Sequence, residues 1–101
     1  MNLEFNTHEY LDKIKKNNEG YFHTFINRDS LAAGILFLKP GGVDSQEPHD
    51  NDEIYYIISG NGYLKIHNKD YAVSEGKVFF VAKNVKHNFF GNTKDLIVLY
   101  F

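Results

Sequence analysis

From Tyr21 onward, the sequence consists of short runs of β-branched and aromatic residues that end in clusters of Gly, Asn, Asp or Ser. The runs favour strands, and the clusters favour turns. Regular short strands with turns at this spacing predict an all-β sandwich or barrel rather than a parallel α/β sheet. The predicted strands are residues 21–26, 31–38, 53–58, 63–67, 71–73, 77–81, 87–90 and 96–101. The segment Gly60-Asn61-Gly62 is expected to form a hairpin turn.

One helix is expected, over residues 7–17. Thr7 can cap its first turn, and Tyr10, Leu11 and Ile14 recur at helical spacing before a lysine-rich end. We expect one domain, with the helix and first strand in residues 1–30 and a barrel in residues 31–101, because 101 residues suit a single core. The helix either covers the barrel or pairs across the two-fold axis of a homodimer.

Charge and cysteine content narrow the function. The chain has 11 basic and 13 acidic side chains, and neither sign forms a block, so nucleic acid and anionic membranes are not expected partners. No apolar run approaches the length of a membrane span. The absence of cysteine excludes disulfides and thiolate ligands, so any metal must be held by nitrogen and oxygen, and it suits the cytoplasm, where we expect the chain.

The densest polar stretch leads directly into an apolar strand. Side chains alternate along a strand, so Glu47 and His49 are expected to face one side, and Glu53 and Tyr55 face the same side if the alternation survives the intervening turn. In a later strand, Val85, His87 and Phe89 share one face, which places a second histidine between apolar neighbours.

Two histidines and one or two glutamates that converge inside a closed sheet would form a site for a divalent transition metal such as Fe, Mn, Zn or Ni. Tyr55 and Phe89 have the same alternation as these residues. They are candidate substrate-binding residues that line a pocket, and core packing is the alternative.

The spacing of these residues resembles the two signature motifs of the cupin superfamily. The first motif, Gly-x5-His-x-His-x3-4-Glu-x6-Gly, is similar to Gly41-x5-Glu47-x-His49-x3-Glu53-x6-Gly60. The second, Gly-x5-Pro-x-Gly-x2-His-x3-Asn, resembles Gly76-x5-Ala82-x-Asn84-x2-His87-x3-Gly91. Every interval is kept, although several residues differ, and 15 residues separate the motifs, as in small single-domain cupins.

The resemblance implies a double-stranded β-helix, or jelly-roll barrel, with a metal held by His49, Glu53 and His87. Glu47 stands where the family has its first histidine, either as a fourth ligand or turned toward solvent. Gln46 is a weaker candidate than Glu47, because strand alternation favours Glu47. It is a candidate ligand, a candidate substrate contact or a hydrogen-bond donor near the ligands.

The resemblance implies a metal-dependent reaction on a small organic molecule, similar to that of an oxygenase or an isomerase. The alternative is a non-catalytic module that binds or senses a small ligand, with or without metal. The fold alone does not decide whether the chain is an enzyme.

Overall fold

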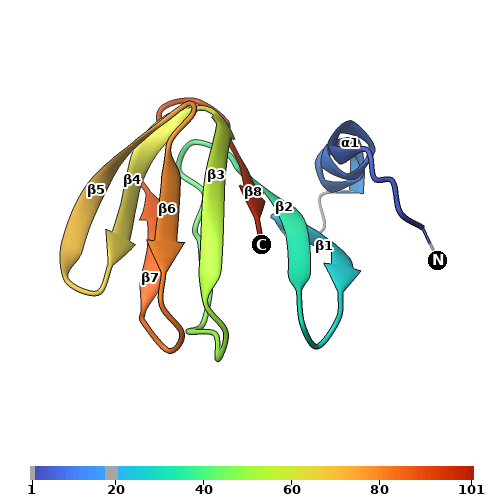
Figure 1. Cartoon of the computed structure of the whole chain (residues 1–101). Coiled ribbons are helices and arrows are strands. Elements are labelled where there is room, and N and C mark those ends of the chain that lie inside the picture. The colour runs from blue at the N-terminus through green and yellow to red at the C-terminus, as the bar shows by residue number, and fades with distance from the viewer. Residues whose placement is uncertain (1, 18–20) are drawn as a thin grey trace.

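The computed structural model describes residues 2–17 and 21–101. It contains one helix and eight strands (Figure 1), and all eight predicted strands are present. The helix α1 spans Thr7–Asn17, with the predicted bounds. The strands are β1 (Phe22–Asn27), β2 (Ala32–Leu38), β3 (Glu53–Ser59), β4 (Asn61–Ile66), β5 (Lys69–Ser74), β6 (Val78–Val81), β7 (His87–Phe90) and β8 (Leu96–Tyr100).

The strands form two antiparallel sheets, as the all-β prediction required. A five-stranded sheet has the order β1-β2-β8-β3-β6, and a three-stranded sheet has the order β5-β4-β7. In Figure 1 the smaller sheet lies beside and behind the β3–β6 end of the larger one. Several paired strands are distant in sequence, such as β2 with β8 and β4 with β7. This arrangement is consistent with the jelly-roll fold.

Gly60 marks a corner between the sheets and not a hairpin turn. β3 belongs to the five-stranded sheet and β4 to the three-stranded one, so the chain changes sheets at this residue. Gly60 has a positive φ of 106°, and a Cβ there would collide with the backbone of Asp95 and Leu96. The expected hairpin is therefore wrong, because the glycine allows a sharp bend and a close backbone approach and does not connect paired strands.

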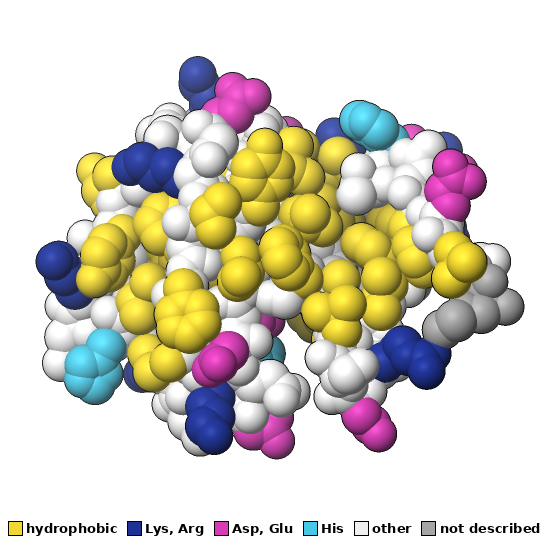
Figure 2. Space-filling model, viewed as in Figure 1, with side chains coloured by type: hydrophobic (Ala, Val, Ile, Leu, Met, Phe, Trp, Pro, Cys, Tyr) yellow, Lys and Arg dark blue, Asp and Glu magenta, His cyan; other side chains and the backbone are white. Residues whose placement is uncertain are grey.

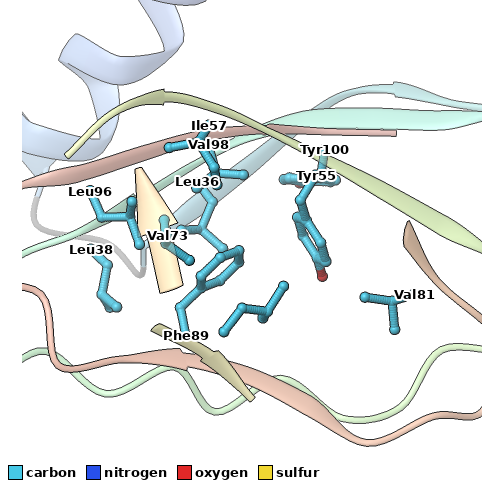
Figure 3. Close-up of a cluster of buried hydrophobic side chains, with 11 residues drawn as sticks. Leu36, Leu38, Tyr55, Ile57, Val73, Val81, Phe89, Leu96, Val98 and Tyr100 are labelled. Carbon is cyan, nitrogen blue, oxygen red and sulfur yellow. The ribbon is translucent and has the colours of Figure 1, made fainter. Parts of the chain in front are cut away.

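The main core lies between the two sheets. It consists of Leu36, Leu38, Tyr55, Ile57, Leu64, Val73, Val81, Phe89, Leu96, Val98 and Tyr100. Figure 3 shows the ring of Tyr55 among these side chains. The strand alternation predicted for β3 and β7 is present, since Tyr55 and Ile57 face this core from one sheet and His87 and Phe89 are buried on the other.

A second apolar cluster joins α1 to the outer face of the larger sheet. Leu11 and Ile14 of the helix pack with Ile35 and Phe37 of β2. The helix therefore covers part of the barrel, which is one of the two roles expected for it from the sequence. Across the described ranges, no helix combines the length and the apolar character that a membrane crossing needs.

Candidate metal centre

Three potential metal ligands meet at one end of the space between the sheets. His49 lies in the segment before β3, Glu53 is the first residue of β3, and His87 is the first residue of β7. One ligand atom from each lies within 4.8 Å of the others. The Glu53 carboxylate oxygen Oε2 is 3.6 Å from His49 Nε2 and 3.5 Å from His87 Nε2. The structure thus brings together the three residues that the cupin resemblance implies as ligands.

Hydrogen bonds hold the segment that carries His49 against the loop that precedes His87. The backbone N–H of Asn84, in the loop before β7, donates to the His49 carbonyl oxygen at 2.5 Å. The backbone N–H of Lys83 donates to Asp52 Oδ1 at 2.9 Å. Because residues 42–49 belong to no regular strand, these contacts rather than a sheet ladder fix the position of His49.

His87 is buried, and its tautomer follows from its partner. Its Nδ1 lies 2.8 Å from the carbonyl oxygen of Val85, which can only accept, so Nδ1 carries a proton. In the neutral ring, Nε2 therefore presents a lone pair to the site. Burial alone would lower the pKa of His87, but the hydrogen bond with Glu53 and the contact with Val85 hold that pKa above its ordinary value.

Glu53 is largely buried and ionised. Burial alone would raise the pKa of its carboxyl group, but hydrogen bonds with His87 and Tyr55 and the nearby His49 lower that pKa below its ordinary value. The site therefore contains a carboxylate between two imidazoles. His49 has the most exposed side chain of the three, at 43%.

Tyr55 contributes its hydroxyl group to the site, while its ring packs in the core. The side chain is fully buried, and its ring meets that of Phe89 edge-on at 5.1 Å between centroids. The hydroxyl oxygen lies 2.7 Å from Glu53 Oε2, 2.8 Å from His87 Nε2 and 2.9 Å from Gln46 Oε1. Burial and the Glu53 charge raise the pKa of Tyr55 far above its ordinary value, so the hydroxyl keeps its proton.

The rings of Tyr55 and Phe89 occupy core positions, which was the alternative to a pocket lining. Phe89 is only 1% exposed and belongs to the main core cluster. Neither residue contributes to the walls of the two cavities that border the site. Both rings thus take the core-packing role, because the strand alternation turns them into the space between the sheets.

Gln46, and not Glu47, points toward the cluster. Gln46 Oε1 is 2.9 Å from the Tyr55 hydroxyl and 3.4 Å from His49 Nε2. Glu47 is exposed and, in the described part of the chain, stands outside the group of converging ligands, although it borders a neighbouring cavity. Strand alternation predicted the reverse, and it fails here because this segment is not a strand.

Asp44 is a buried part of the site that the sequence did not reveal. Its carboxylate accepts hydrogen bonds from the Tyr21 hydroxyl at 2.9 Å, the Phe89 backbone N–H at 2.7 Å and Gln46 Nε2 at 2.7 Å. Gln46 is a local partner, but Tyr21 and Phe89 are distant from Asp44 in sequence, so no local pattern marks the burial of an aspartate that follows Val43 in a loop. A lone acidic residue directly before the polar stretch is the only signal present.

The polar atoms of the site carry more lone pairs than protons. Asp44 takes the Gln46 amide N–H group, so the amide oxygen Oε1 faces the site. With neutral His87, the Tyr55 hydroxyl has one proton for three acceptors, Gln46 Oε1, Glu53 Oε2 and His87 Nε2. His49 Nε2 lies farther away, at 3.4 Å from Gln46 Oε1 and 3.6 Å from Glu53 Oε2, and donates only in the forms that are protonated at Nε2. Such a surplus of acceptors is suited to a cation, because a metal ion accepts several lone pairs at once.

The spacing of the ligand atoms also suits a metal ion. Nitrogen and oxygen ligands bind Zn²⁺ or similar ions at about 2.0–2.2 Å, so ligand atoms around one ion lie roughly 3–3.6 Å apart. The Nε2–Oε2 separations of 3.5 and 3.6 Å match this range. Two imidazoles and a carboxylate are ligands for Fe, Mn, Zn or Ni, and together they leave further coordination positions open.

Two cavities border the cluster. The larger one, of about 380 Å³, lies between His49 and Glu53 on one side and the β1–β2 hairpin, with Arg28 and Leu31, on the other. The smaller one, of about 240 Å³, is lined by Tyr21, Phe22 and the segment that carries Gln46, and it also reaches His49 and Glu53. The site is therefore accessible to a small molecule from outside the barrel.

Comparisons with known proteins agree with this architecture. The uncharacterized protein SCO3923 of Streptomyces coelicolor is 32% identical over 89 residues, which cover 88% of this chain and 85% of that protein. A conserved protein of unknown function from Streptococcus pyogenes, SPY1581, has a similar structure, with a TM-score of 0.72 and 19% identity over 84% of this chain and 74% of the other. A predicted oxalate decarboxylase from Thermotoga maritima has a TM-score of 0.68 and 22% identity over 78% and 75% of the two chains.

The family comparison covers the barrel. Residues 34–101 match the cupin domain family, and this range includes most of β2, all of β3 to β8 and all three converging ligands. The spacing of the two motifs, the two antiparallel sheets and this match agree with one another. The chain is therefore a member of the cupin family, with a conserved-barrel domain of the small type.

Proposed function

We propose that this chain is a metal-dependent cupin that holds one divalent transition metal through His49, Glu53 and His87 and acts on a small organic molecule. The observation that carries the proposal is the surplus of lone pairs around the Tyr55 hydroxyl, where one proton serves three acceptors. A bound metal would act as a Lewis acid toward an oxygen atom of the substrate or as the site of dioxygen chemistry.

The residues of the chain have separate parts in this proposal. His87 is buried and fixed by Val85, so it holds the metal at the inner end of the site. His49 is the most exposed of the three side chains and stands at the cavity side. Gln46 lines the smaller cavity, so its amide can orient a polar substrate there through a hydrogen bond. The buried Tyr55 hydroxyl holds Gln46 Oε1 in position.

The cavities support a small substrate. The larger cavity measures about 380 Å³, which is at the low end of the range of roughly 300–1,000 Å³ that small-molecule sites occupy. The Thermotoga maritima neighbour is described as a predicted oxalate decarboxylase, a name that implies a small organic acid. The cysteine-free composition suits this activity in the cytoplasm.

The test of this proposal is metal content. The chain is purified without a nickel column, and its metals are measured by elemental analysis. We expect about one equivalent of Fe, Mn, Zn or Ni, and we expect the His87→Ala variant to lose it. His67→Ala is the matched control, because His67 is exposed in the turn between β4 and β5. Protein that is isolated without metal and binds none at micromolar concentration contradicts the proposal.

One observation favours a second candidate, a metal-free module that binds a small ligand. The Tyr55 hydroxyl already bridges Glu53 and His87, and the described residues contain no buried side-chain polar atom without a partner. A protonated His87 would complete this network without a metal. Metal-free protein whose melting temperature is unchanged by Fe²⁺, Mn²⁺ or Zn²⁺ is the result expected for this candidate.

A further inference from the structure

The smaller cavity beside the candidate metal centre has a wall of three aromatic rings, those of Tyr21, Phe22 and Tyr100. The Phe22 ring meets the Tyr21 ring at 5.3 Å and the Tyr100 ring at 6.5 Å between centroids, with an interplanar angle of 72° in both pairs. His49 and Glu53, two of the converging ligands, line the same cavity. A molecule in this cavity can therefore contact the rings and the metal centre together.

The register of the larger sheet builds most of this wall. Tyr100 of β8 lies opposite Tyr55 of β3 on one side and opposite Gly34 of β2 on the other. A Cβ at Gly34 would collide with the Tyr100 ring, so the glycine leaves the space in which the Tyr100 side chain reaches Thr24. Phe22 stands two residues before Thr24 in β1 and shares its face of the sheet. Two of the three rings are thus held by regular strands.

The wall offers carbon surface rather than hydrogen-bonding groups. The Tyr21 hydroxyl donates to Asp44 Oδ1 at 2.9 Å and accepts from the Ser45 backbone N–H at 3.1 Å. The Tyr100 hydroxyl is hydrogen-bonded to Thr24 Oγ1 at 2.6 Å. Both hydroxyl groups are therefore used within the chain, and Phe22 has none. Phe22 is also the most accessible of the three rings, because its residue is 53% exposed.

The charge of the smaller cavity is negative. Glu47 and Glu53 line it, and its lining includes no Lys or Arg. A metal at the centre would take the charge of Glu53, but Glu47 stands outside the group of converging ligands. Within the described ranges, the Glu47 carboxylate has no hydrogen-bond or ion-pair partner. The metal centre therefore leaves one carboxylate of this cavity unused.

The larger cavity has a different lining. Figure 2 shows it as a hollow between the loop before β3 and the β1–β2 hairpin, with acidic and basic side chains near its rim. Arg28 lines it together with Asp29 and Asp52. Such mixed charges do not favour one sign of ligand. The smaller cavity, with its aromatic wall and one unused carboxylate, is the more selective of the two.

We propose that the smaller cavity binds an alkylated ammonium group, and that the substrate of this cupin is a small organic cation of this kind with a carboxylate at its other end. Aromatic rings attract alkylated ammonium groups, and Glu47 provides the opposite charge. An anion would be repelled by Glu47, and an uncharged apolar group would leave Glu47 without a partner. The carboxylate end of the substrate rests on the proposed metal-dependent function, whereas binding of the ammonium group needs no metal.

The first test uses metal-free protein and tetramethylammonium, which has the cationic group alone. Titration of the full chain followed by NMR in chelator is expected to show binding. Phe22→Leu keeps an apolar side chain but loses the ring, so we expect it to weaken binding about 3–10-fold. Glu47→Gln should weaken binding about 3-fold through the lost charge. Tyr63→Leu is the matched control, because Tyr63 is a 46% exposed aromatic residue on the three-stranded sheet.

Two outcomes of this titration overturn the proposal. Wild-type protein that does not bind tetramethylammonium at millimolar concentration lacks the ammonium site. Equal binding by wild type and Phe22→Leu shows that the aromatic wall does not recognise the cation. Phe22 and Glu47 are both exposed, so neither substitution disturbs the core between the sheets.

The second test compares two ligands of the same shape on metal-loaded protein. Trimethylglycine carries an ammonium group and a carboxylate, and in the anion of tert-butylacetic acid a carbon atom replaces the nitrogen and removes the positive charge. We expect calorimetry to show at least about 10-fold tighter binding of trimethylglycine. Glu47→Gln should reduce this preference and leave the metal affinity unchanged.

The results distinguish this proposal from the proposed function. Equal affinities for the two ligands on protein that does contain metal overturn the ammonium site and leave the metal-dependent function standing. Protein that binds no metal but binds tetramethylammonium through Phe22 and Glu47 contradicts the metal-dependent function and supports the ammonium site.

Discussion

Gln46 Nε2 donates a hydrogen bond to Asp44 Oδ2 at 2.7 Å, and this contact decides which end of the amide faces the candidate metal centre. A carboxylate only accepts hydrogen bonds, so the amide nitrogen must face Asp44 and the oxygen must face Tyr55 and His49. The buried aspartate thereby turns Gln46 into an acceptor toward the site. Asp44 is itself held by Tyr21 and Phe89, and through these contacts the orientation depends on the folded barrel.

The first prediction separates Gln46 from Glu47. Gln46→Ala removes an acceptor beside Tyr55 and His49, and we expect it to weaken metal affinity by about 10-fold, the effect of losing a group that supports the ligands. Glu47→Ala is the matched control, because the Glu47 side chain is exposed and stands apart from the converging ligands. Competition against a chelator measures both affinities. A larger loss in Glu47→Ala would restore Glu47 as a ligand.

The second prediction concerns the Tyr55 hydroxyl. In metal-free protein, Tyr55→Phe removes the donor that Glu53, His87 and Gln46 share, and we expect the free energy of unfolding to fall by about 1–3 kcal/mol. With metal bound, the ion would satisfy the lone pairs of Glu53 and His87. Tyr55→Phe should then lower the free energy of unfolding by a smaller amount.

Melting temperatures of wild type and variant, each with chelator and with metal, give the comparison. Added metal should stabilise Tyr55→Phe more than it stabilises wild type. An equal loss of stability with and without metal would show that the hydroxyl and the metal do not share these partners.

The sequence predicted the fold and part of the site, and the difference follows from backbone regularity. Glu53 and His87 begin strands, so side-chain alternation placed them correctly between the sheets. Gln46 and Glu47 lie in a segment without regular structure, where alternation has no physical basis. The sequence therefore ranked Glu47 above Gln46, whereas the structure turns Gln46 toward the site. Asp44 was missed because its burial depends on Tyr21 and Phe89, which only the folded chain brings near.

The third prediction is the pH dependence of the metal-free protein. The pKa of His87 is raised in the fold, so its contribution to stability is fully present below its unfolded pKa, about 6.5, and is lost as pH rises through the higher folded pKa. The pKa of Glu53 is lowered, so its contribution is present above its unfolded pKa, about 4.3, and is lost as pH falls through the lower folded pKa.

The metal-free protein should therefore be most stable between about pH 4.3 and 6.5. Thermal unfolding in chelator at pH values below, within and above this range measures the curve. Glu53→Gln should flatten both sides, because it removes the carboxylate and the main cause of the raised His87 pKa. Metal affinity should instead increase as pH rises through the His87 pKa, since the ion and the proton compete for Nε2. A wild-type curve without a decline above pH 6.5 would contradict the assigned shift of His87.

The last prediction concerns the corner between the sheets. Gly60 and Gly76 both have positive φ angles, of 106° and 89°, so an alanine is strained at either position. They differ in their surroundings, because a Cβ at Gly60 would meet the Asp95 backbone, whereas a Cβ at Gly76 has no heavy atom within 4 Å. We expect Gly76→Ala to cost about 1 kcal/mol from backbone strain alone. Gly60→Ala should cost several-fold more, because the corner must also open. Chemical denaturation measures both free energies of unfolding, and equal losses would mean that the close approach to Asp95 does not constrain the corner.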